Sequence, residues 1–204
     1  MNESGDLALG PVPNRTSVLL LDLHTHKDFS LSDVMTNTGF QVLASVSSLE
    51  QLSEALKKAN PHLIFVSMPI IDMSDLSTIE ALCPEQYPCA VFADGAVVGM
   101  ANKLMALGVS AFVVGDSSPE KVFHGIGIAL ARFAYTKKLK QGLEQTQEKL
   151  EQRKVIDRAK GLLMDRRGMT ESEAYHALRK VAMNSGQPMA VIAQGVLDSQ
   201  ALMV

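Results

Sequence analysis

The stretch SVLLLDL, residues 17–23, is a short apolar run rich in Val and Leu, a composition that predicts a buried β-strand. Comparable runs recur at 41–46, 62–68, 89–94 and 110–116. Between these runs lie segments that favour helices, at 29–40, 47–61, 73–83 and 97–108. Strands that alternate with helices in this way predict βαβ units and a parallel sheet. The expected fold class is α/β, with a flavodoxin-like doubly wound five-strand sheet within residues 17–130.

The ends of the first two helices are predicted from single residues. Gly39 stands where a left-handed cap would end the first helix. Ser47 and Glu50 have the spacing of a capping box, which would open the second helix. Pro61 follows that helix and would stop it.

Charge is distributed unevenly along the 204 residues, whose formal net charge is −3. Residues 132–204 hold 13 of the 19 Lys and Arg residues but 8 of the 22 Asp and Glu residues, a balance of +5. An acidic front part and a basic tail suggest two roles, with the tail meeting an anion. A solvated basic helix is the plainer alternative.

The composition also bears on location. No apolar run reaches the length of a membrane span. Residues 1–16 have neither the basic start nor the apolar middle of a signal peptide, and we expect them to form a flexible leader. Cys83 and Cys89 are interpreted as incidental reduced thiols. Together these features predict a cytoplasmic protein.

Residues at the ends of the predicted strands fall where this fold forms its ligand crevice. They are Asp22 with Leu23, then Ser67, Ala93 and Gly115. This part of the chain resembles the receiver domain of response regulators, which carries an acidic pair, a phosphoacceptor Asp, a Ser or Thr and a Lys at these places. Of the groups that would hold Mg²⁺ and the phosphoryl oxygens, Asp22 alone remains in the sequence. The resemblance therefore implies a pseudo-receiver with a degenerate phosphoacceptor site.

Little else in the front part points to catalysis. A nucleophilic Ser67 needs a neighbouring base, and the sequence offers no evident one. His24 and His26 are expected to be solvated loop residues. A weak cation site near the crevice edge stays open, built from Asp72, Asp75 and Asp94. We expect no catalytic residue, no resident metal and no cofactor, and hence a protein that is not an enzyme.

A long helix is predicted from Ser118, as N-cap, to Arg167, because Pro119 suits the first helical position and no further Pro interrupts the segment. Four of its residues follow the four-three-four steps of a coiled-coil seam: Leu139, Leu143, Thr146 and Leu150. We interpret residues 131–155 as a coiled-coil stem for dimerisation. A solvent-bridging linker helix is the alternative.

Two shorter helices are predicted after the stem. Thr170 and Glu173 have capping-box spacing and would open the first, which Gly186 would end. Pro188 would start the last helix. The inner face of this small bundle is expected to comprise Ile156, Ala159, Leu163, Ala174, Leu178, Val181, Ala182, Met183, Ile192, Val196 and Leu197.

Three motifs in the tail resemble the ANTAR domain, an RNA-binding antiterminator module: AKGLLM (159–164), EAYHALRKVAM (173–183) and VIAQGVL (191–197). A pseudo-receiver, a coiled stem and an ANTAR domain at 156–200 together resemble the nitrate-assimilation antiterminators of NasT type and the amidase regulator AmiR. The resemblance implies a dimer that binds two hairpins of a leader RNA and promotes transcriptional read-through. It also implies control by a ligand-sensing partner protein, like NasS or AmiC, rather than by phosphorylation.

Carried over residue by residue, the resemblance makes Lys160, Arg167 and Arg179 the foremost RNA-contact candidates. The second rank comprises Arg158, Arg166, Lys180, Tyr175 and His176. Ion pairing of Lys160 or Arg179 with Asp157, Asp165 or Glu173 is the alternative for those two cations. Two interpretations compete for the whole chain: a DNA-binding response regulator, and an interaction or dimerisation protein that binds no nucleic acid. The tail helices are too apolar for a polar, base-reading recognition helix.

Overall fold

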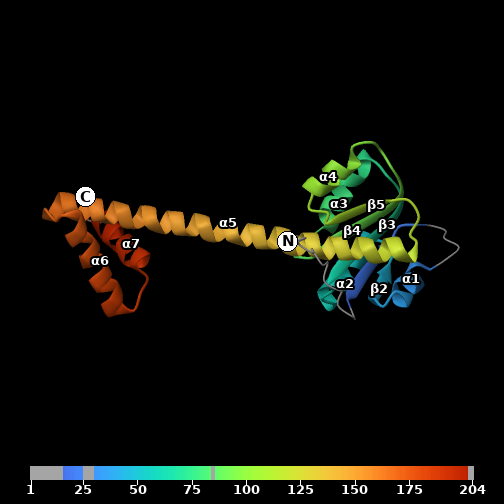
Figure 1. The fold of residues 1–204 in the computed structure, drawn as a ribbon, viewed down its shortest axis with the longest axis horizontal. Coiled ribbons are helices and arrows are strands. Elements are labelled where there is room, and N and C mark those ends of the chain that lie inside the picture. Colours follow the sequence, from blue (N-terminus) through green and yellow to red (C-terminus); the bar gives the residue numbers. More distant parts are fainter. Residues whose placement is uncertain (1–15, 25–29, 84–85, 202–204) are drawn as a thin grey trace, which may run out of the picture. The chain divides into compact units, whose positions relative to one another are not determined.

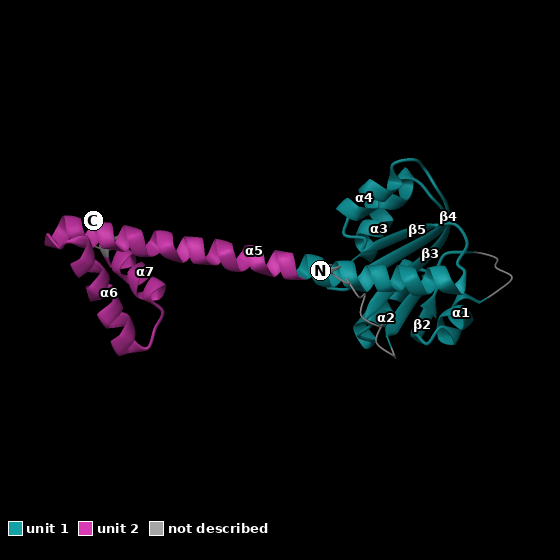
Figure 2. Ribbon diagram, in the orientation of Figure 1, with its two compact units in different colours: residues 1–137 teal, residues 138–204 magenta. Residues whose placement is uncertain are grey.

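The computed structural model describes residues 16–24, 30–83 and 86–201. Most of the predicted leader, together with Thr25 and His26, lies outside these residues. The chain divides into two compact units, residues 1–137 and residues 138–204 (Figure 2). No helix of the described residues is long and apolar enough to cross a membrane.

The first unit is built on a sheet of five parallel strands (Figure 1). They are β1 (Ser17–Asp22), β2 (Gln41–Val46), β3 (Leu63–Ile71), β4 (Cys89–Ala96) and β5 (Ala111–Val114). Their spatial order is β2-β1-β3-β4-β5. This is the doubly wound, flavodoxin-like order, in which the crevice lies at the carboxyl ends of the strands. The predicted fold class is confirmed.

Helices cover both faces of the sheet, because successive strand residues point to opposite sides. The connecting elements are α1 (Leu31–Asn37), α2 (Leu49–Lys58), the 3-10 turn η1 (Met73–Asp75), α3 (Leu76–Leu82) and α4 (Met100–Ala106). On one face, Leu19, Ile64 and Val91 pack against side chains of α2, α3 and α4. On the other, Leu20, Phe65 and Phe92 pack against α1 and the start of α5 (Pro119–Arg167).

Several local predictions in this unit need correction. Ser48, not Ser47, caps α2: its backbone is extended, and its hydroxyl accepts a hydrogen bond from the Gln51 amide. The predicted helix at 73–83 is divided between η1 and α3, and that at 97–108 is shortened to α4. Strands β3 and β4 run past their predicted ends, because Ile70 and Ile71 pair with Gly95 and Ala96.

The predicted long helix is confirmed as α5, which runs without interruption from Pro119 to Arg167. It is followed by α6 (Glu171–Ser185) and α7 (Met189–Ala201). The predicted capping box opens α6: Thr170 accepts from the Glu173 amide, and the Glu173 carboxylate accepts from the Thr170 amide. The hydrogen bonds that the Thr170 amide and then the Thr170 hydroxyl donate to the Glu173 carboxylate lower the pKa of Glu173. Gly186 ends α6 with a left-handed backbone, φ 65°.

The second unit has a small apolar core between the end of α5 and the two following helices. Ala159, Leu178 and Ala193 are buried at its centre. Partly buried side chains surround them: Val155, Ile156, Leu163, Met189, Ile192, Val196 and Leu197. Two residues predicted for this core are instead exposed, Val181 at 50% and Met183 at 71%. Ala174, Leu178 and Ala182 already fill the inner face of α6, so their neighbours turn outward.

Helix α5 contains glycines that face different surroundings. An ideal Cβ on Gly125 would lie 2.4 Å from Cζ of Phe92, a fully buried ring that stacks on Phe65 with centroids 4.5 Å apart. Nothing lies within 4 Å of an ideal Cβ on Gly142. The first glycine therefore permits close packing of the helix on the sheet, and the second only weakens the helix.

Gly125→Ala should destabilise the first unit by about 1–3 kcal/mol, because the added methyl group displaces a buried ring. Gly142→Ala, the matched control, should be neutral or stabilising by about 0.5–1 kcal/mol, since it restores helix propensity without a clash. Urea unfolding followed by circular dichroism measures both. If the two substitutions changed the free energy of unfolding equally, the Phe92 ring would be able to move aside without cost.

Candidate functional site

The predicted phosphoacceptor positions converge at one edge of the sheet. Asp22 is paired with Ser67 across β1 and β3, and the Leu23 amide donates to the Ser67 carbonyl at 2.8 Å. The Gly115 amide donates to the Ala93 carbonyl at 2.9 Å. The carboxyl ends of four neighbouring strands therefore bring the degenerate receiver-like residues together.

A histidine fills this edge. His24 Nδ1 lies 2.8 Å from Asp22 Oδ1, and its Nε2 lies 3.0 Å from Asp94 Oδ2. The side chain is only 6% exposed, so the prediction of a solvated loop residue was wrong for His24. Carboxylates only accept hydrogen bonds, so the ring nitrogens are the groups that can donate in these contacts. The His24 ring therefore lies between the two acids and links β1 to β4.

His24 also lies next to Ser67, the residue at the phosphoacceptor position. The Ser67 hydroxyl oxygen lies 3.2 Å from His24 Nδ1, so a base that the sequence did not reveal is within reach. That nitrogen lies closer to Asp22, however, and Ser67 is fully buried. The hydroxyl is part of a polar cluster with His24 and presents no open nucleophile to a substrate.

The weak cation site considered from the sequence is not assembled. Asp72 accepts from the Ser74 amide at 2.7 Å, and Asp75 accepts from the Asp72 amide at 2.9 Å. These two carboxylates cap η1, and the hydrogen bonds from Ser74 lower the pKa of Asp72. Within the described part of the chain, no group of three or more His, Cys, Asp or Glu residues could hold a metal ion.

The position at which a receiver domain carries Lys also differs in this chain. Gly115 has a left-handed backbone, φ 116°, at the place where the resemblance expects Lys. The nearest ammonium belongs to Lys121, in the first turns of α5, and it pairs with Asp116. This ion pair, with its hydrogen bond as the main cause, lowers the pKa of Asp116.

In the second unit, Lys160 is engaged by acids. Its ammonium lies 2.8 Å from an Asp157 oxygen and 2.7 Å from a Glu171 oxygen, and the side chain is 14% exposed. The hydrogen bonds to Asp157 and then Glu171 raise the pKa of Lys160. The sequence left ion pairing open for this residue and named Asp157 among its partners. The structure adds Glu171, so Lys160 ties the last turns of α5 to the start of α6.

The other five cationic candidates for RNA contact are more accessible than Lys160. Arg158, Arg166, Arg167, Arg179 and Lys180 are all exposed. Arg158 lies near Glu151, whose pKa it helps to lower after the larger effect of Lys154. The remaining four form no ion pair with any described residue. Their charges are therefore available to an external anion.

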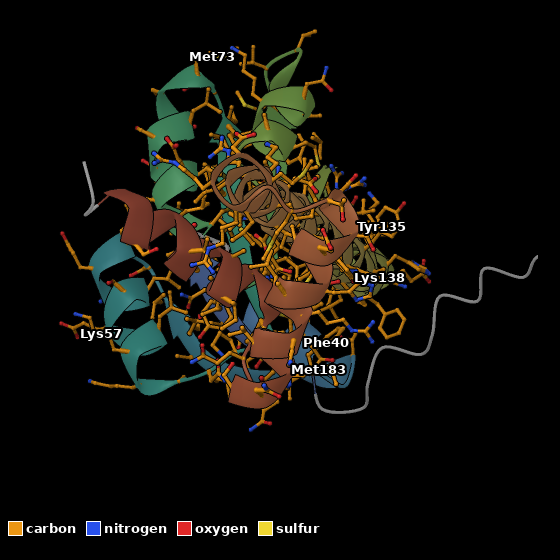
Figure 3. The ribbon with its side chains drawn as sticks, turned by 90° about the vertical axis from the view of Figure 1, so that its left-hand side faces the viewer. Phe40, Lys57, Met73, Tyr135, Lys138 and Met183 are labelled. Atoms are coloured by element: carbon orange, nitrogen blue, oxygen red, sulfur yellow. The ribbon has the colours of Figure 1, made fainter. Side chains whose placement is uncertain are left out.

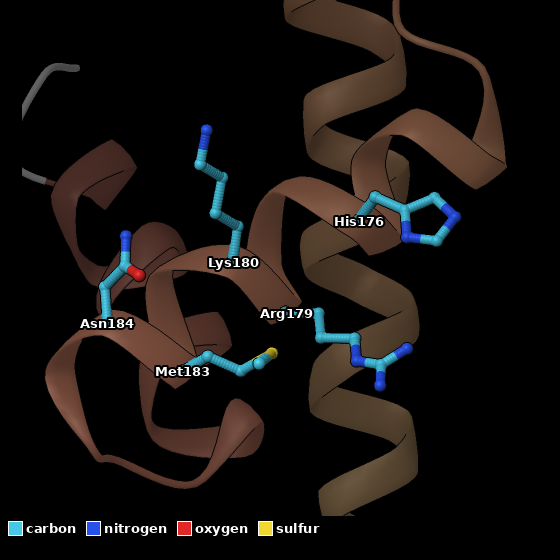
Figure 4. Close-up of a pocket in the computed structure, with 5 residues that line it drawn as sticks. All are labelled: His176, Arg179, Lys180, Met183 and Asn184. Carbon is cyan, nitrogen blue, oxygen red and sulfur yellow. The ribbon is translucent and has the colours of Figure 1, made fainter.

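One face of α6 is hollowed. A solvent-open hollow of about 400 Å³ is lined by His176, Arg179, Lys180, Met183 and Asn184 (Figure 4). Three of these residues were candidates from the sequence. Met183 was assigned to the core and Asn184 was missed, although their steps from Arg179 and Lys180 match the helical repeat. Figures 3 and 4 show the Met183 side chain projecting from the helix.

The predicted stem carries exposed apolar side chains. Leu139, Leu143 and Leu150 are 57%, 59% and 52% exposed, and Tyr135 just before them is 65% exposed (Figure 3). The Thr146 hydroxyl donates to the Gly142 carbonyl at 2.8 Å and is thus satisfied within the helix. In the single chain this stripe of leucines faces solvent.

A known protein family matches part of the second unit. The family model of the ANTAR domain matches residues 144–197, which comprise the end of the stem and the small bundle. The chain therefore carries an ANTAR domain. It is also 26% identical over 190 residues to the transcriptional regulatory protein PdtaR of Mycobacterium tuberculosis, across 92% of this chain and 91% of that protein.

Two further relatives match a shorter part of the chain. The nitrate regulatory protein of Klebsiella oxytoca is 45% identical over 60 residues, which are 29% of this chain and 15% of that protein. The aliphatic amidase regulator of Pseudomonas aeruginosa is 43% identical over 63 residues, which are 31% of this chain and 32% of that protein. The chain thus spans only a small part of either relative.

Two solved structures are similar as well. HP1043, an orphan response regulator of H. pylori, aligns with a TM-score of 0.47 at 18% identity, over 57% of this chain and 98% of that one. The NasR transcription antiterminator aligns with a TM-score of 0.28 at 29% identity, over 50% and 28%. The fold is assigned from the strand order of the sheet and not from these two alignments.

His24→Ala should lower the melting temperature of the first unit at neutral pH, because Asp22 and Asp94 lose the hydrogen-bond donor that they share. MgCl₂ or MnCl₂ should raise the melting temperature of the variant more than that of the wild type, since a cation can then reach both carboxylates. Thermal unfolding over a metal titration measures this.

The control is His24→Ala combined with Asp94→Asn, which should lose the metal response. A wild-type chain that gains as much stability from magnesium as the variant would contradict the account of His24 as the group that keeps a metal ion from the two carboxylates.

Proposed function

We propose that this chain is a non-enzymatic, cytoplasmic regulator of transcription antitermination that acts by binding the hairpins of a leader RNA. The observation that carries the proposal is the coincidence of an ANTAR match at 144–197 with exposed arginines on the same segment that form no ion pair with a described residue. The printed names of two relatives, a nitrate regulatory protein and an aliphatic amidase regulator, and of the NasR antiterminator support a regulatory role.

The proposed RNA surface consists of the four cations without an acidic partner among the described residues: Arg166, Arg167, Arg179 and Lys180. Phosphate contacts by such cations release counterions and supply affinity. Arg158, Tyr175 and His176 extend this surface as secondary candidates. Lys160 contributes mainly by holding α5 and α6 together, because its ammonium already meets two carboxylates.

Dimerisation through the stem is part of the proposal. The exposed leucines at 139, 143 and 150 follow coiled-coil spacing, and a second copy would remove them from water. Two copies present two ANTAR domains, one for each of two hairpins. The linked pair then binds more tightly than a single domain does.

Control by a ligand-sensing partner protein, of the kind that NasS and AmiC represent, completes the proposal. The first unit has Ser67, Ala93 and Gly115 where phosphoryl chemistry needs a carboxylate, a hydroxyl and an ammonium. Its crevice edge is occupied by His24. These features favour a surface that a partner recognises over a domain that is switched by phosphate.

Arg167→Ala combined with Arg179→Ala should weaken binding of the full chain to hairpin RNA and reduce the slope of log K against log salt by about one per lost phosphate contact. The melting temperature should not change, because neither residue is paired with a described acid. An electrophoretic shift series at increasing salt measures the slope.

Lys57→Ala combined with Lys58→Ala, at the end of α2, is the charge-matched control and should bind RNA like the wild type. Equal affinity for duplex DNA would favour a DNA-binding regulator. Failure of the dimeric wild-type chain to bind either nucleic acid would leave an interaction protein.

Leu139→Glu combined with Leu143→Glu should shift the chain to monomer, because acidic side chains would face each other across the seam. Sedimentation equilibrium measures the association constant. Gln141→Glu with Gln145→Glu adds the same charge to exposed positions outside the seam and should leave the dimer intact. A monomeric wild-type chain would refute the assignment of the stem.

A further inference from the structure

We infer that Cys83 and Cys89 form a reversible oxidation site in the first unit, at which a small organic disulfide converts the two thiols into an internal disulfide. They are the only two cysteines of the chain, and both are free thiols in the structure. The inference goes beyond the proposed function and does not depend on RNA binding.

The fold brings the two side chains into one apolar environment. Cys83 follows the last turn of α3, where its amide donates to the Ile79 carbonyl at 3.0 Å. Cys89 begins β4 and is paired with Ile64 of β3. Cys89 is fully buried in the cluster on the sheet face that α2, α3 and α4 cover, and Cys83 packs against the same cluster. The end of a helix and the start of a strand therefore place their sulfur atoms together.

The two thiols are also hydrogen-bond partners. This hydrogen bond, and then burial, raise the pKa of Cys89 well above its ordinary value. A buried thiol that stays protonated reacts slowly with an oxidant from solvent. Cys83 is only partly buried, so it is the thiol that a small molecule can reach. An accessible cysteine beside a second one that can resolve it is the arrangement of redox-sensitive pairs.

The backbone of Cys89 is held on the other side of β4 as well. The Ser110 amide donates to the Cys89 carbonyl at 2.7 Å, and the Cys89 amide donates to the Ser110 hydroxyl at 3.4 Å. The buried sulfur therefore has a defined position next to Cys83. A disulfide requires close Cβ atoms, and thiols that already contact each other need little rearrangement to meet this requirement.

The oxidation proceeds in two exchange steps. First, the Cys83 thiolate attacks one sulfur of the small disulfide, whose S–S bond breaks as a mixed disulfide forms on Cys83. Second, Cys89 loses its proton to solvent and its thiolate attacks the Cys83 sulfur, which releases the other half of the small disulfide. Two protein thiols are oxidised, one small disulfide is reduced, and the two protons end on the released thiols. An excess of small thiol reverses both steps.

The oxidation site is separate from the crevice edge. Cys89 lies at the amino end of β4, whereas Asp94, the partner of His24, lies toward the carboxyl end of the same strand. The disulfide would tie the end of α3 to the start of β4 and would leave the contacts of His24 in place. In a compartment rich in small thiols such a bond is transient, as it is in redox-sensing proteins.

The test treats the folded full chain with oxidised glutathione and measures its mass without a reducing agent. The wild type should lose the mass of two hydrogen atoms and stay a single covalent chain. Cys89→Ala should stop at the first step and accumulate one glutathione on Cys83, because no thiol remains to release it. Cys83→Ser should stay unmodified, since Cys89 is buried.

Urea unfolding of the same samples measures whether the folded unit accepts the disulfide. The oxidised wild type should unfold at a higher urea concentration than the reduced one, because the bond restricts the unfolded chain. Dithiothreitol should reverse this shift. Cys83→Ser is the matched control and should have the same midpoint with and without oxidant. Circular dichroism before oxidation shows which variants fold, and the wild-type and Cys83→Ser results stand even if Cys89→Ala does not.

Four results would overturn the inference. One is a wild-type chain that stays unmodified or keeps glutathione without closing the disulfide. Another is a disulfide between two chains in place of the internal one. A third is a folded Cys83→Ser variant that takes up glutathione as readily as the wild type does. The fourth is an oxidised chain that unfolds at a lower urea concentration, which would show that the bond strains the folded unit. Because no RNA is used, each of these results leaves the proposed RNA binding untouched.

Discussion

A single helix, α5, has to serve three environments along its 49 residues, and the rest of the chain depends on how it does so. Near its start, Val122, Ile126 and Ala129 are buried against the sheet, and Gly125 gives room to the Phe92 ring. Farther on, leucines face water at coiled-coil spacing. At its end, Ala159 is buried against α6 and α7, and Lys160 reaches Glu171. Each unit is therefore completed by a part of the same helix.

The two units differ in whether their charged side chains have partners within the unit. In the first, the acids at the sheet edge have a partner within the unit, since the His24 ring lies between Asp22 and Asp94. A site of this kind has little need of an external cation and offers little to a phosphoryl group. In the second, one lysine is neutralised by Asp157 and Glu171, while the neighbouring arginines stay exposed. The contrast supports the proposal that a partner protein recognises the first unit, whereas RNA binds to the second.

Much of the fold could be predicted because its signals are local. Runs of apolar residues indicated the strands, and the Thr170–Glu173 spacing indicated the start of α6. The choice between Ser47 and Ser48 could not be made in this way, because both are good capping residues. The exposure of Val181 and Met183 depended on which face of α6 the small core could cover. His24 was missed because its partner Asp94 is 70 residues away and meets it only in the folded sheet.

Ultraviolet crosslinking of the full chain to a selected hairpin RNA, followed by mass spectrometry of the crosslinked peptides, tests the central claim most directly. The account predicts crosslinks in the last turns of α5 and along α6, with competition by unlabelled hairpin and not by duplex DNA. Crosslinks concentrated in residues 16–114, or crosslinks lost equally to duplex DNA, would contradict it.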